Sequence, residues 1–192
     1  MRALVIDPAV PGGLSLGEAA DPMPSAHQVV VQIQAVSLNR GEVSGIPRAK
    51  PGTVLGWDAA GTVIQAAADG RGPEVGTRVV TLGGAGGWAE RRAVGTTDLA
   101  VLPEGLDAGL ASALPVAGVT ALRAIRLCGG VVGRRILITG ASGGVGRFGV
   151  QLAHRAGAHV VALVGNTQRG AGLADLGANE VVTDIETGVT PV

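Results

Sequence analysis

A short apolar run is followed by small residues in the stretch ILITGASGGVG at 136–146. Small residues in this position are typical of a phosphate-binding turn. The apolar start of the stretch predicts a buried strand, and apolar residues at helical spacing resume near Gly144. A helix that begins directly after a tight turn leaves backbone N–H groups unpaired, and these suit a pyrophosphate. Gly143 and Gly146 let a ligand and a neighbouring strand approach the backbone, whereas Ala141 stands where the usual fingerprint has its first glycine. The predicted cofactor contacts here are Ala141, Ser142, Gly143, Gly144, Val145 and Gly146.

The residues after this turn complete a unit of strand, turn, helix and strand. Apolar residues recur at helical spacing at Val145, Leu152 and Ala156, and Gly157 is a natural helix end. Residues 159–164 form a second apolar run, so the unit has about the 30 residues that a dinucleotide-binding fold needs. A glycine turn that only packs a helix against a strand is the alternative.

The loop after the second strand indicates which nicotinamide cofactor binds. A site that prefers NAD places Asp or Glu there to bind the ribose hydroxyls, and the same carboxylate repels a 2′-phosphate. Residues 164–169 read VGNTQR, and no acidic residue follows before Asp175. We therefore predict NADPH as the cofactor, with Asn166, Thr167 and Arg169 as phosphate contacts. Arg169 as an ordinary exposed helix residue is the alternative.

The composition excludes several function classes. Fifteen basic residues balance fifteen acidic ones, and the chain has two Trp, one Phe and no Tyr. It therefore lacks both the positive stripe and the stacking platform of a nucleic-acid-binding protein. The hydrophobic fraction of 46% and mean hydropathy of +0.40 are ample for a core.

The sequence leads us to expect neither a signal peptide nor a membrane span. Asp7 and Pro8 interrupt the N-terminal residues before a signal-peptide core, and no apolar run reaches the ~18 residues of a membrane span. Cys128 is the single cysteine, so no internal disulfide can form. We expect a cytoplasmic protein with no membrane partner.

The order of the remaining elements predicts two domains. Short strands separated by Gly and Pro are expected at 2–6, 28–36, 61–65, 78–82, 89–94 and 99–102. The pattern changes near Pro115, after which residues 116–127 have helical spacing. A helix at 167–176, a third parallel strand at 180–183 and an unstructured end at 186–192 are expected to follow. We therefore predict a β domain at 1–115 and an α/β domain at 116–192.

The second domain has only half of the usual dinucleotide-binding sheet. An open fold of this kind normally contains two strand–helix halves with six strands. Residues 116–192 account for one half, and we therefore expect the sequence to be truncated.

Several motifs together resemble the medium-chain dehydrogenase/reductases, and among these the zinc-independent quinone oxidoreductase-like branch. In order along the chain they are AVSLNR at 35–40, LGWDAAG at 55–61, GGWAE at 86–90, LPEGL at 102–106, ALPVAGVTA at 113–121, and the glycine stretch. The resemblance implies an N-terminal chaperonin-10-like β-barrel domain and a C-terminal Rossmann domain. It also implies that the last segment of a longer chain returns to complete the first domain, and that the complete protein forms a homodimer.

The same resemblance bears on metal binding. Zinc alcohol dehydrogenases carry a Cys where this chain has Asn39, a His where it has Trp57, and a third ligand near Val116. The three histidines here are scattered without ligand spacing. We therefore expect no metal, and we expect Asp58, at the position of an acidic residue beside the zinc, to be structural.

Without a metal, hydride transfer needs an acceptor that is already electrophilic, together with donors that stabilise the developing oxyanion. The resemblance therefore implies an NADPH-dependent reductase of quinones or α,β-unsaturated carbonyls, with a small-molecule electrophile as substrate. It places Asn39 and Arg40 at the substrate as catalytic candidates and Thr120 near the nicotinamide. In the alternative interpretations, Asn39 caps a turn, Arg40 is solvated and Thr120 packs its helix.

Two other functions remain open. One is an enoyl reductase acting on acyl thioesters, for which Arg48 and Lys50 could provide cations along a phosphopantetheine path. The other is a non-catalytic NADPH-binding or interaction protein.

Overall fold

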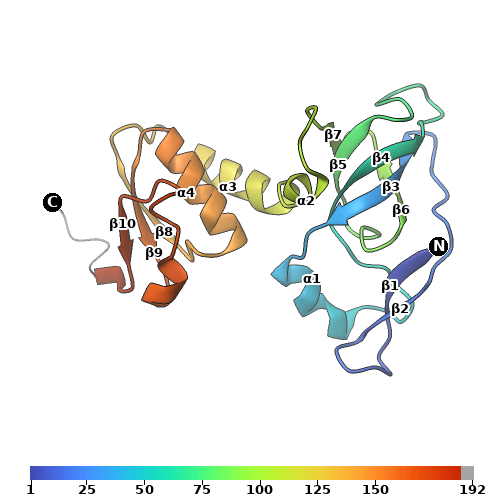
Figure 1. The fold of residues 1–192 in the computed structure, drawn as a ribbon, viewed down its shortest axis with the longest axis horizontal. Coiled ribbons are helices and arrows are strands. Elements are labelled where there is room, and N and C mark those ends of the chain that lie inside the picture. Colours follow the sequence, from blue (N-terminus) through green and yellow to red (C-terminus); the bar gives the residue numbers. More distant parts are fainter. Residues whose placement is uncertain (187–192) are drawn as a thin grey trace. The chain divides into compact units, whose positions relative to one another are not determined.

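The computed structural model describes residues 1–186. The chain divides into two compact units, Met1–Val116 and Ala117–Val192, which are described separately (Figure 1). The unstructured end expected at 186–192 lies, apart from Glu186, outside the described residues.

The first unit is built on a five-stranded antiparallel sheet with the strand order β6-β3-β4-β5-β7. Its strands are β3 (Gln28–Val36), β4 (Asp58–Gln65), β5 (Arg78–Leu82), β6 (Arg91–Gly95) and β7 (Leu99–Val101). Alternating residues of the strands face the core, as Val29, Val31 and Val63 show with no exposed surface. The register between β3 and β4 shifts at two places, and such irregularities let a sheet curl.

Smaller elements surround this sheet. A two-stranded antiparallel ribbon, β1 (Arg2–Ile6) and β2 (Leu14–Glu18), reaches the rest of the unit through the isolated bridges of Ala3 with Ala89 and Val5 with Val54. Three short helical segments are α1 (Arg40–Gly45), η1 (Ile46–Arg48) and α2 (Ala108–Ser112). The sequence analysis did not predict β2 or these three segments, because each is too short to give a clear periodic pattern.

The second unit is a parallel sheet with helices. Helix α3 (Pro115–Leu127) begins at the boundary between the units. The sheet has the order β10-β9-β8 and consists of β8 (Arg135–Thr139), β9 (His159–Leu163) and β10 (Glu180–Val182). Helix α4 (Gly144–Arg155) connects β8 to β9, and its apolar face packs on the sheet (Figure 1). This core is made chiefly of small and β-branched residues, including Val150, Ala153, Val160, Ala162 and Leu173.

One expected element is wrong. Residues 167–176 do not form an α-helix: a 3₁₀ turn, η2 (Thr167–Gly170), is followed by further turns. Gly172 has a φ of +74°, which an α-helix cannot accommodate. A Cβ on Gly170 would lie 2.7 Å from Cγ1 of Val181, so this glycine lets the turn approach β10 closely. These two glycines therefore set the geometry of the turn.

The remaining strand expectations are correct to within a few residues. The largest difference is at β4, which begins at Asp58 and not at Gly61. A curled antiparallel β unit followed by a parallel α/β unit confirms the predicted fold class. Among residues 1–186, no helix combines the length and apolar character needed to cross a membrane.

Candidate functional site

The turn between β8 and α4 is fixed by three backbone features. Gly140 has a φ of +60°, in the left-handed region where glycine carries no penalty. The N–H of Gly143 donates to the carbonyl of Gly140 over 2.9 Å and closes the turn. The N–H of Ala141 donates to the carbonyl of Leu163 over 3.1 Å, and this bond ties the turn to the end of β9.

Two positions in the turn show why the chain uses glycine there. A Cβ on Gly146 would overlap the carbonyl oxygen of Gly140 and lie 2.6 Å from the Cα of Ala141. A Cβ on Gly143 would lie 3.3 Å from the same carbonyl oxygen, which is a tight contact. Ala141 is fully buried and belongs to the core of this unit, so a methyl group is accommodated at that position.

The start of α4 leaves backbone donors free. The N–H of Arg147 is the first in the helix to find an acceptor, at the carbonyl of Gly143 over 2.9 Å. Within residues 1–186, the N–H groups of Gly144, Val145 and Gly146 have no acceptor. Gly143, Gly144 and Val145 are exposed, so a ligand has access to this helix end. Free N–H groups together with the positive end of the helix dipole bind phosphate.

The predicted phosphate contacts after β9 lie at the same end of the sheet. Thr139 and Leu163 are register partners at the carboxyl ends of parallel strands, so the two following loops emerge side by side. The Asn166 side-chain oxygen accepts the N–H of Arg169 over 3.0 Å and caps η2, which leaves its amide NH₂ group available. Thr167 and Arg169 are both exposed. The structure therefore brings the glycine turn and the predicted phosphate contacts to one edge.

Thr120 lies on α3 and is exposed. A Cβ placed on Gly144 would lie 3.6 Å from the Cβ of Ala117, so α3 passes close to the glycine turn. Thr120 follows Ala117 by one helical turn, and the structure therefore places it on the helix beside the predicted cofactor site.

In the first unit, Asn39 is held at two points. It occupies the N-cap position of α1 and forms a capping box with Glu42. The side-chain Nδ2 donates to Oδ2 of Asp58 over 2.9 Å, and the backbone N–H donates to Oε2 of Glu42 over 2.6 Å. Arg40, in contrast, is exposed, and its side chain has no hydrogen bond or ion pair within the described part of the chain. The structure therefore fixes Asn39 and leaves Arg40 in solvent.

Asp58 is the centre of a buried polar cluster. Its side chain has no exposed surface. Besides Asn39, the hydroxyl of Ser37 donates to Oδ2 over 2.9 Å, and the backbone N–H of Val116 donates to Oδ1 over 3.1 Å. Three donors thus compensate for removing this carboxylate from water.

Two further charged residues complete the cluster. Glu42 is 3% exposed, and its Oε1 accepts the backbone N–H of Trp57 over 2.5 Å. Arg92 is 4% exposed and donates to the carbonyl of Trp57 over 2.8 Å and to the hydroxyl of Thr81 over 3.1 Å. Burial lowers the pKa of the Arg92 guanidinium, and the neighbouring carboxylates of Asp58, Glu42 and Asp98 act in the opposite direction.

The sequence analysis missed Ser37, Glu42 and Arg92 as members of this cluster. Glu42 and Arg92 are charged, and a prediction from hydrophobic periodicity places charged residues on the exposed face of an element. The sequence of β6 contains one indication that Arg92 is buried. Arg92 lies two residues before Val94, so both side chains are on the face of the strand that points to the core.

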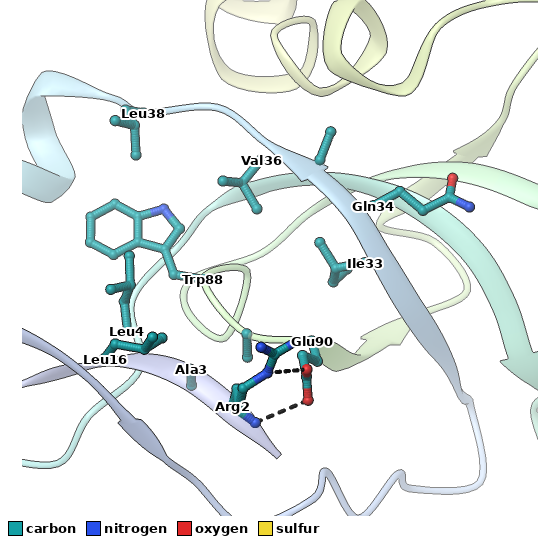
Figure 2. Close-up of a pocket in the computed structure, with 12 residues that line it drawn as sticks. Arg2, Ala3, Leu4, Leu16, Ile33, Gln34, Val36, Leu38, Trp88 and Glu90 are labelled. Carbon is teal, nitrogen blue, oxygen red and sulfur yellow. Dashed lines mark hydrogen bonds and ion pairs between the residues drawn. The ribbon is translucent and has the colours of Figure 1, made fainter.

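A separate hollow of about 390 Å³ lies where the β1–β2 ribbon meets the end of β3 (Figure 2). Its lining is mainly apolar and includes Leu4, Leu16, Val36, Leu38 and Trp88. Arg2 and Glu90 form an ion pair at its edge over 2.7 Å. Neither Asn39 nor Arg40 lines this hollow, so it is distinct from the polar cluster.

Metal-ligating side chains do not gather in the described part of the chain. Within residues 1–186, no three His, Cys, Asp or Glu side chains are arranged so that they could hold a metal ion.

Comparisons with known proteins identify relatives of the chain. Residues 25–104 match the family model of the alcohol dehydrogenase GroES-like domain. The chloroplast envelope quinone oxidoreductase homolog of Arabidopsis thaliana is 38% identical over 189 residues, which cover 88% of this chain and 56% of that protein. The acryloyl-coenzyme A reductase of Sulfurisphaera tokodaii is 27% identical over 201 residues, covering 88% of this chain and 60% of that protein.

A solved structure shares the fold of the chain. The quinone oxidoreductase of Thermus thermophilus, whose structure is also known in complex with NADPH, is 31% identical and superimposes with a TM-score of 0.79. The match covers 94% of this chain and 59% of that one. The chain thus spans 56–60% of the length of these three relatives.

Proposed function

Because the chain belongs to the medium-chain dehydrogenase/reductase superfamily, we propose that the full-length protein is an NADPH-dependent, metal-free oxidoreductase. Its substrate is a small electrophile, a quinone or an α,β-unsaturated carbonyl compound. The proposal rests chiefly on one observation: three N–H groups at the start of α4, which have no acceptor within residues 1–186, lie beside a loop without a carboxylate.

The choice of NADPH follows from charge. The N–H groups of Gly144, Val145 and Gly146 bind the pyrophosphate, and the amide of Asn166, the hydroxyl of Thr167 and the guanidinium of Arg169 bind the 2′-phosphate. Residues 164–169 contain no acidic residue that would repel this phosphate. The NADPH complex of the Thermus thermophilus relative supports the same choice.

The chemistry of the cofactor is hydride donation, and the protein supplies orientation and charge stabilisation. When hydride reaches the β-carbon of an enone, negative charge develops on the carbonyl oxygen. We assign the Nδ2–H group of Asn39 that is not bonded to Asp58 to this oxyanion, with the Arg40 guanidinium nearby. Thr120 lies near the nicotinamide. Residues 1–192 contain no tyrosine, so they supply no tyrosine proton donor.

The proposal extends to the setting of the protein. We propose a homodimer in the cytoplasm with no nucleic-acid or membrane partner. Size-exclusion chromatography of the full-length protein tests the dimer directly.

One relative favours a second candidate function. The Sulfurisphaera tokodaii protein is called an acryloyl-coenzyme A reductase, which acts on an acyl thioester. Arg48 and Lys50 are both exposed and could bind the phosphates of such a substrate. A third candidate, an NADPH-binding protein without catalytic activity, is retained as the outcome in which binding occurs without turnover.

Spectroscopic assays separate these candidates. NADPH oxidation is followed with the full-length protein and 1,4-benzoquinone, an alkenal or crotonyl-CoA as acceptor. Turnover of the quinone or alkenal supports the proposed function, and turnover of crotonyl-CoA alone supports the thioester reductase. A fluorescence titration in which NADH binds as tightly as NADPH contradicts the cofactor assignment.

A further inference from the structure

We infer that Asp58 is a positioning residue that fixes the direction in which Asn39 presents its amide group to the substrate. The inference deepens the proposed function and rests on it, because the substrate-facing role of Asn39 belongs to that proposal. Asp58 itself is fully buried and touches no reacting atom.

The bond between the two side chains defines the orientation of the amide. An asparagine side chain can rotate by half a turn and exchange its oxygen for its NH₂ group with little change in shape. A carboxylate oxygen only accepts hydrogen bonds, so Nδ2 of Asn39 has to face Oδ2 of Asp58, as the 2.9 Å distance shows. The reversed orientation would place two acceptor oxygens against each other. Asp58 therefore selects one of the two amide orientations.

Asp58 is itself immobile. Its Oδ1 is held by the backbone N–H of Val116 over 3.1 Å, and its Oδ2 accepts the hydroxyl of Ser37 over 2.9 Å. Arg92 carries a buried positive charge that interacts with it. Because each oxygen of the carboxylate accepts a hydrogen bond, the Asp58 side chain is held against rotation. The position of Oδ2, and with it the hydrogen bond to Asn39, is therefore fixed.

The backbone of Asn39 is fixed by a second carboxylate. Glu42 accepts the Asn39 N–H at Oε2 and the Trp57 N–H at Oε1, over 2.6 and 2.5 Å. Trp57 directly precedes Asp58, so the start of β4 holds Asn39 at both its main chain and its side chain. Within residues 1–186, one Nδ2–H group of Asn39 is left for a ligand, in a defined direction.

The test is the substitution Asp58→Asn in the full-length protein. The new NH₂ group can replace Oδ2 while Oδ1 still accepts from Val116, and Asn39 then rotates its amide to accept. The shape of the cluster is retained, but the NH₂ group of Asn39 moves to the place that Oδ1 occupied and no longer offers its N–H in the original direction. We expect kcat for enone reduction to fall at least about tenfold, as when an oxyanion donor is lost, while the Kd for NADPH changes less than about twofold.

A double variant distinguishes the effect of the amide orientation on catalysis from its effect on the stability of the protein. In Asn39→Asp with Asp58→Asn, the hydrogen bond between the two side chains is restored with its direction reversed. We expect its melting temperature to return toward that of the wild type, whereas kcat stays low because the carboxylate that replaces the amide at position 39 has no N–H to donate. Asp107→Asn is the matched control: Asp107 lies in the same unit and also accepts a backbone N–H, that of Leu110 over 3.0 Å, and it has no link to Asn39.

An NMR measurement reports the orientation independently of activity. The Asn39 side-chain NH₂ signals, assigned through Asn39→Asp, should shift in Asp58→Asn and remain unchanged in Asp107→Asn. Shifted signals together with a low kcat support the inference. Unshifted signals, or shifted signals with kcat within twofold of the wild type, overturn it. If the wild type reduces no acceptor, the proposed function fails and this role of Asp58 fails with it, whatever the signals show.

Discussion

The side-chain Nδ2 atom of Asn39 lies 2.9 Å from Oδ2 of Asp58, at the centre of a cluster that holds two carboxylates and one guanidinium away from water. Asn39 also occupies the N-cap position of α1 and forms a capping box with Glu42. Its amide is directed to the start of β4, and the backbone N–H of Asn39 is directed to Glu42. The local fold therefore holds Asn39 at both its side chain and its main chain.

Replacing Glu42 by Gln should destabilise the first unit. Both carboxylate oxygens accept backbone N–H groups, from Asn39 and Trp57, and an NH₂ group in place of one oxygen would face a donor. The loss of one charge-assisted bond inside the protein predicts a decrease of about 2–3 kcal/mol in the free energy of unfolding, measured in urea. Glu104→Gln is an exposed control with no expected effect. Equal stability of both variants would contradict the importance of these contacts.

Replacing Asn166 by Asp should change the cofactor preference. Asp keeps the oxygen that caps η2 by accepting the Arg169 N–H, so the loop is expected to retain its shape. The added negative charge repels a 2′-phosphate, and we expect the Kd for NADPH to rise at least about tenfold, with little change for NADH. Both constants are measured by fluorescence titration. Asn179→Asp is the matched control, because the Asn179 side-chain oxygen also accepts a backbone N–H, that of Val160 over 2.8 Å. An unchanged Kd for NADPH in Asn166→Asp would contradict the assignment of this loop.

Replacing Gly146 by Ala should disrupt the glycine turn. The added methyl group would overlap the carbonyl of Gly140 and force the turn away from α4. Overpacking of this kind predicts a loss of about 1–3 kcal/mol in stability, together with weaker NADPH binding. Gly130→Ala is the control, since a Cβ there meets no atom within 4 Å. Wild-type affinity for NADPH in Gly146→Ala would show that the turn does not hold the pyrophosphate.

The stability of the second unit should depend on pH through Glu180. Arg135 donates to both oxygens of Glu180, over 2.5 and 2.9 Å, and lowers the pKa of this carboxyl below its ordinary value of 4.5; His159 contributes in the same direction. A carboxyl with a lowered pKa stabilises the folded state above its unfolded pKa, and this stabilisation is lost as the pH falls through the folded pKa. Glu180→Gln should therefore be less stable than the wild type at neutral pH, and the difference should decrease as the pH falls below the ordinary carboxyl pKa of 4.5.

Urea unfolding of both proteins across this pH range gives the measurement. The three side chains are partly exposed, so added salt should also reduce the difference. A difference in stability that stays constant from about pH 7 to about pH 3 would contradict the role of the ion pair.

Much of the fold follows from local patterns in the sequence. The alternation of apolar and polar residues in Gln28–Val36 predicts β3, because a strand with one buried face has an apolar residue at every second position. The apolar run before Gly140 predicts β8, because a strand buried on both faces is apolar throughout. Gly172 shows a limit of this reasoning. A glycine can lower helix stability slightly or require a left-handed turn, and only the surrounding structure decides between these outcomes.

The candidate site was predictable where contacts are local. The glycine turn follows from neighbouring residues, whereas the cluster around Asp58 joins Ser37, Glu42 and Arg92 from three separate elements. Charged residues are normally placed in solvent when a sequence is interpreted, and they are buried here only because each finds partners distant in sequence. Long-range pairing of this kind leaves no periodic signal.

Transfer of deuterium from NADPH that carries deuterium at both C4 positions of the nicotinamide tests the proposed function most directly. The full-length protein is incubated with the labelled cofactor and an enone, and the product is examined by mass spectrometry and NMR. We predict one deuterium at the β-carbon of the saturated ketone, with no metal added and a chelator present. Unlabelled product, or NADPH bound without formation of product from any enone or quinone, would contradict the proposed function.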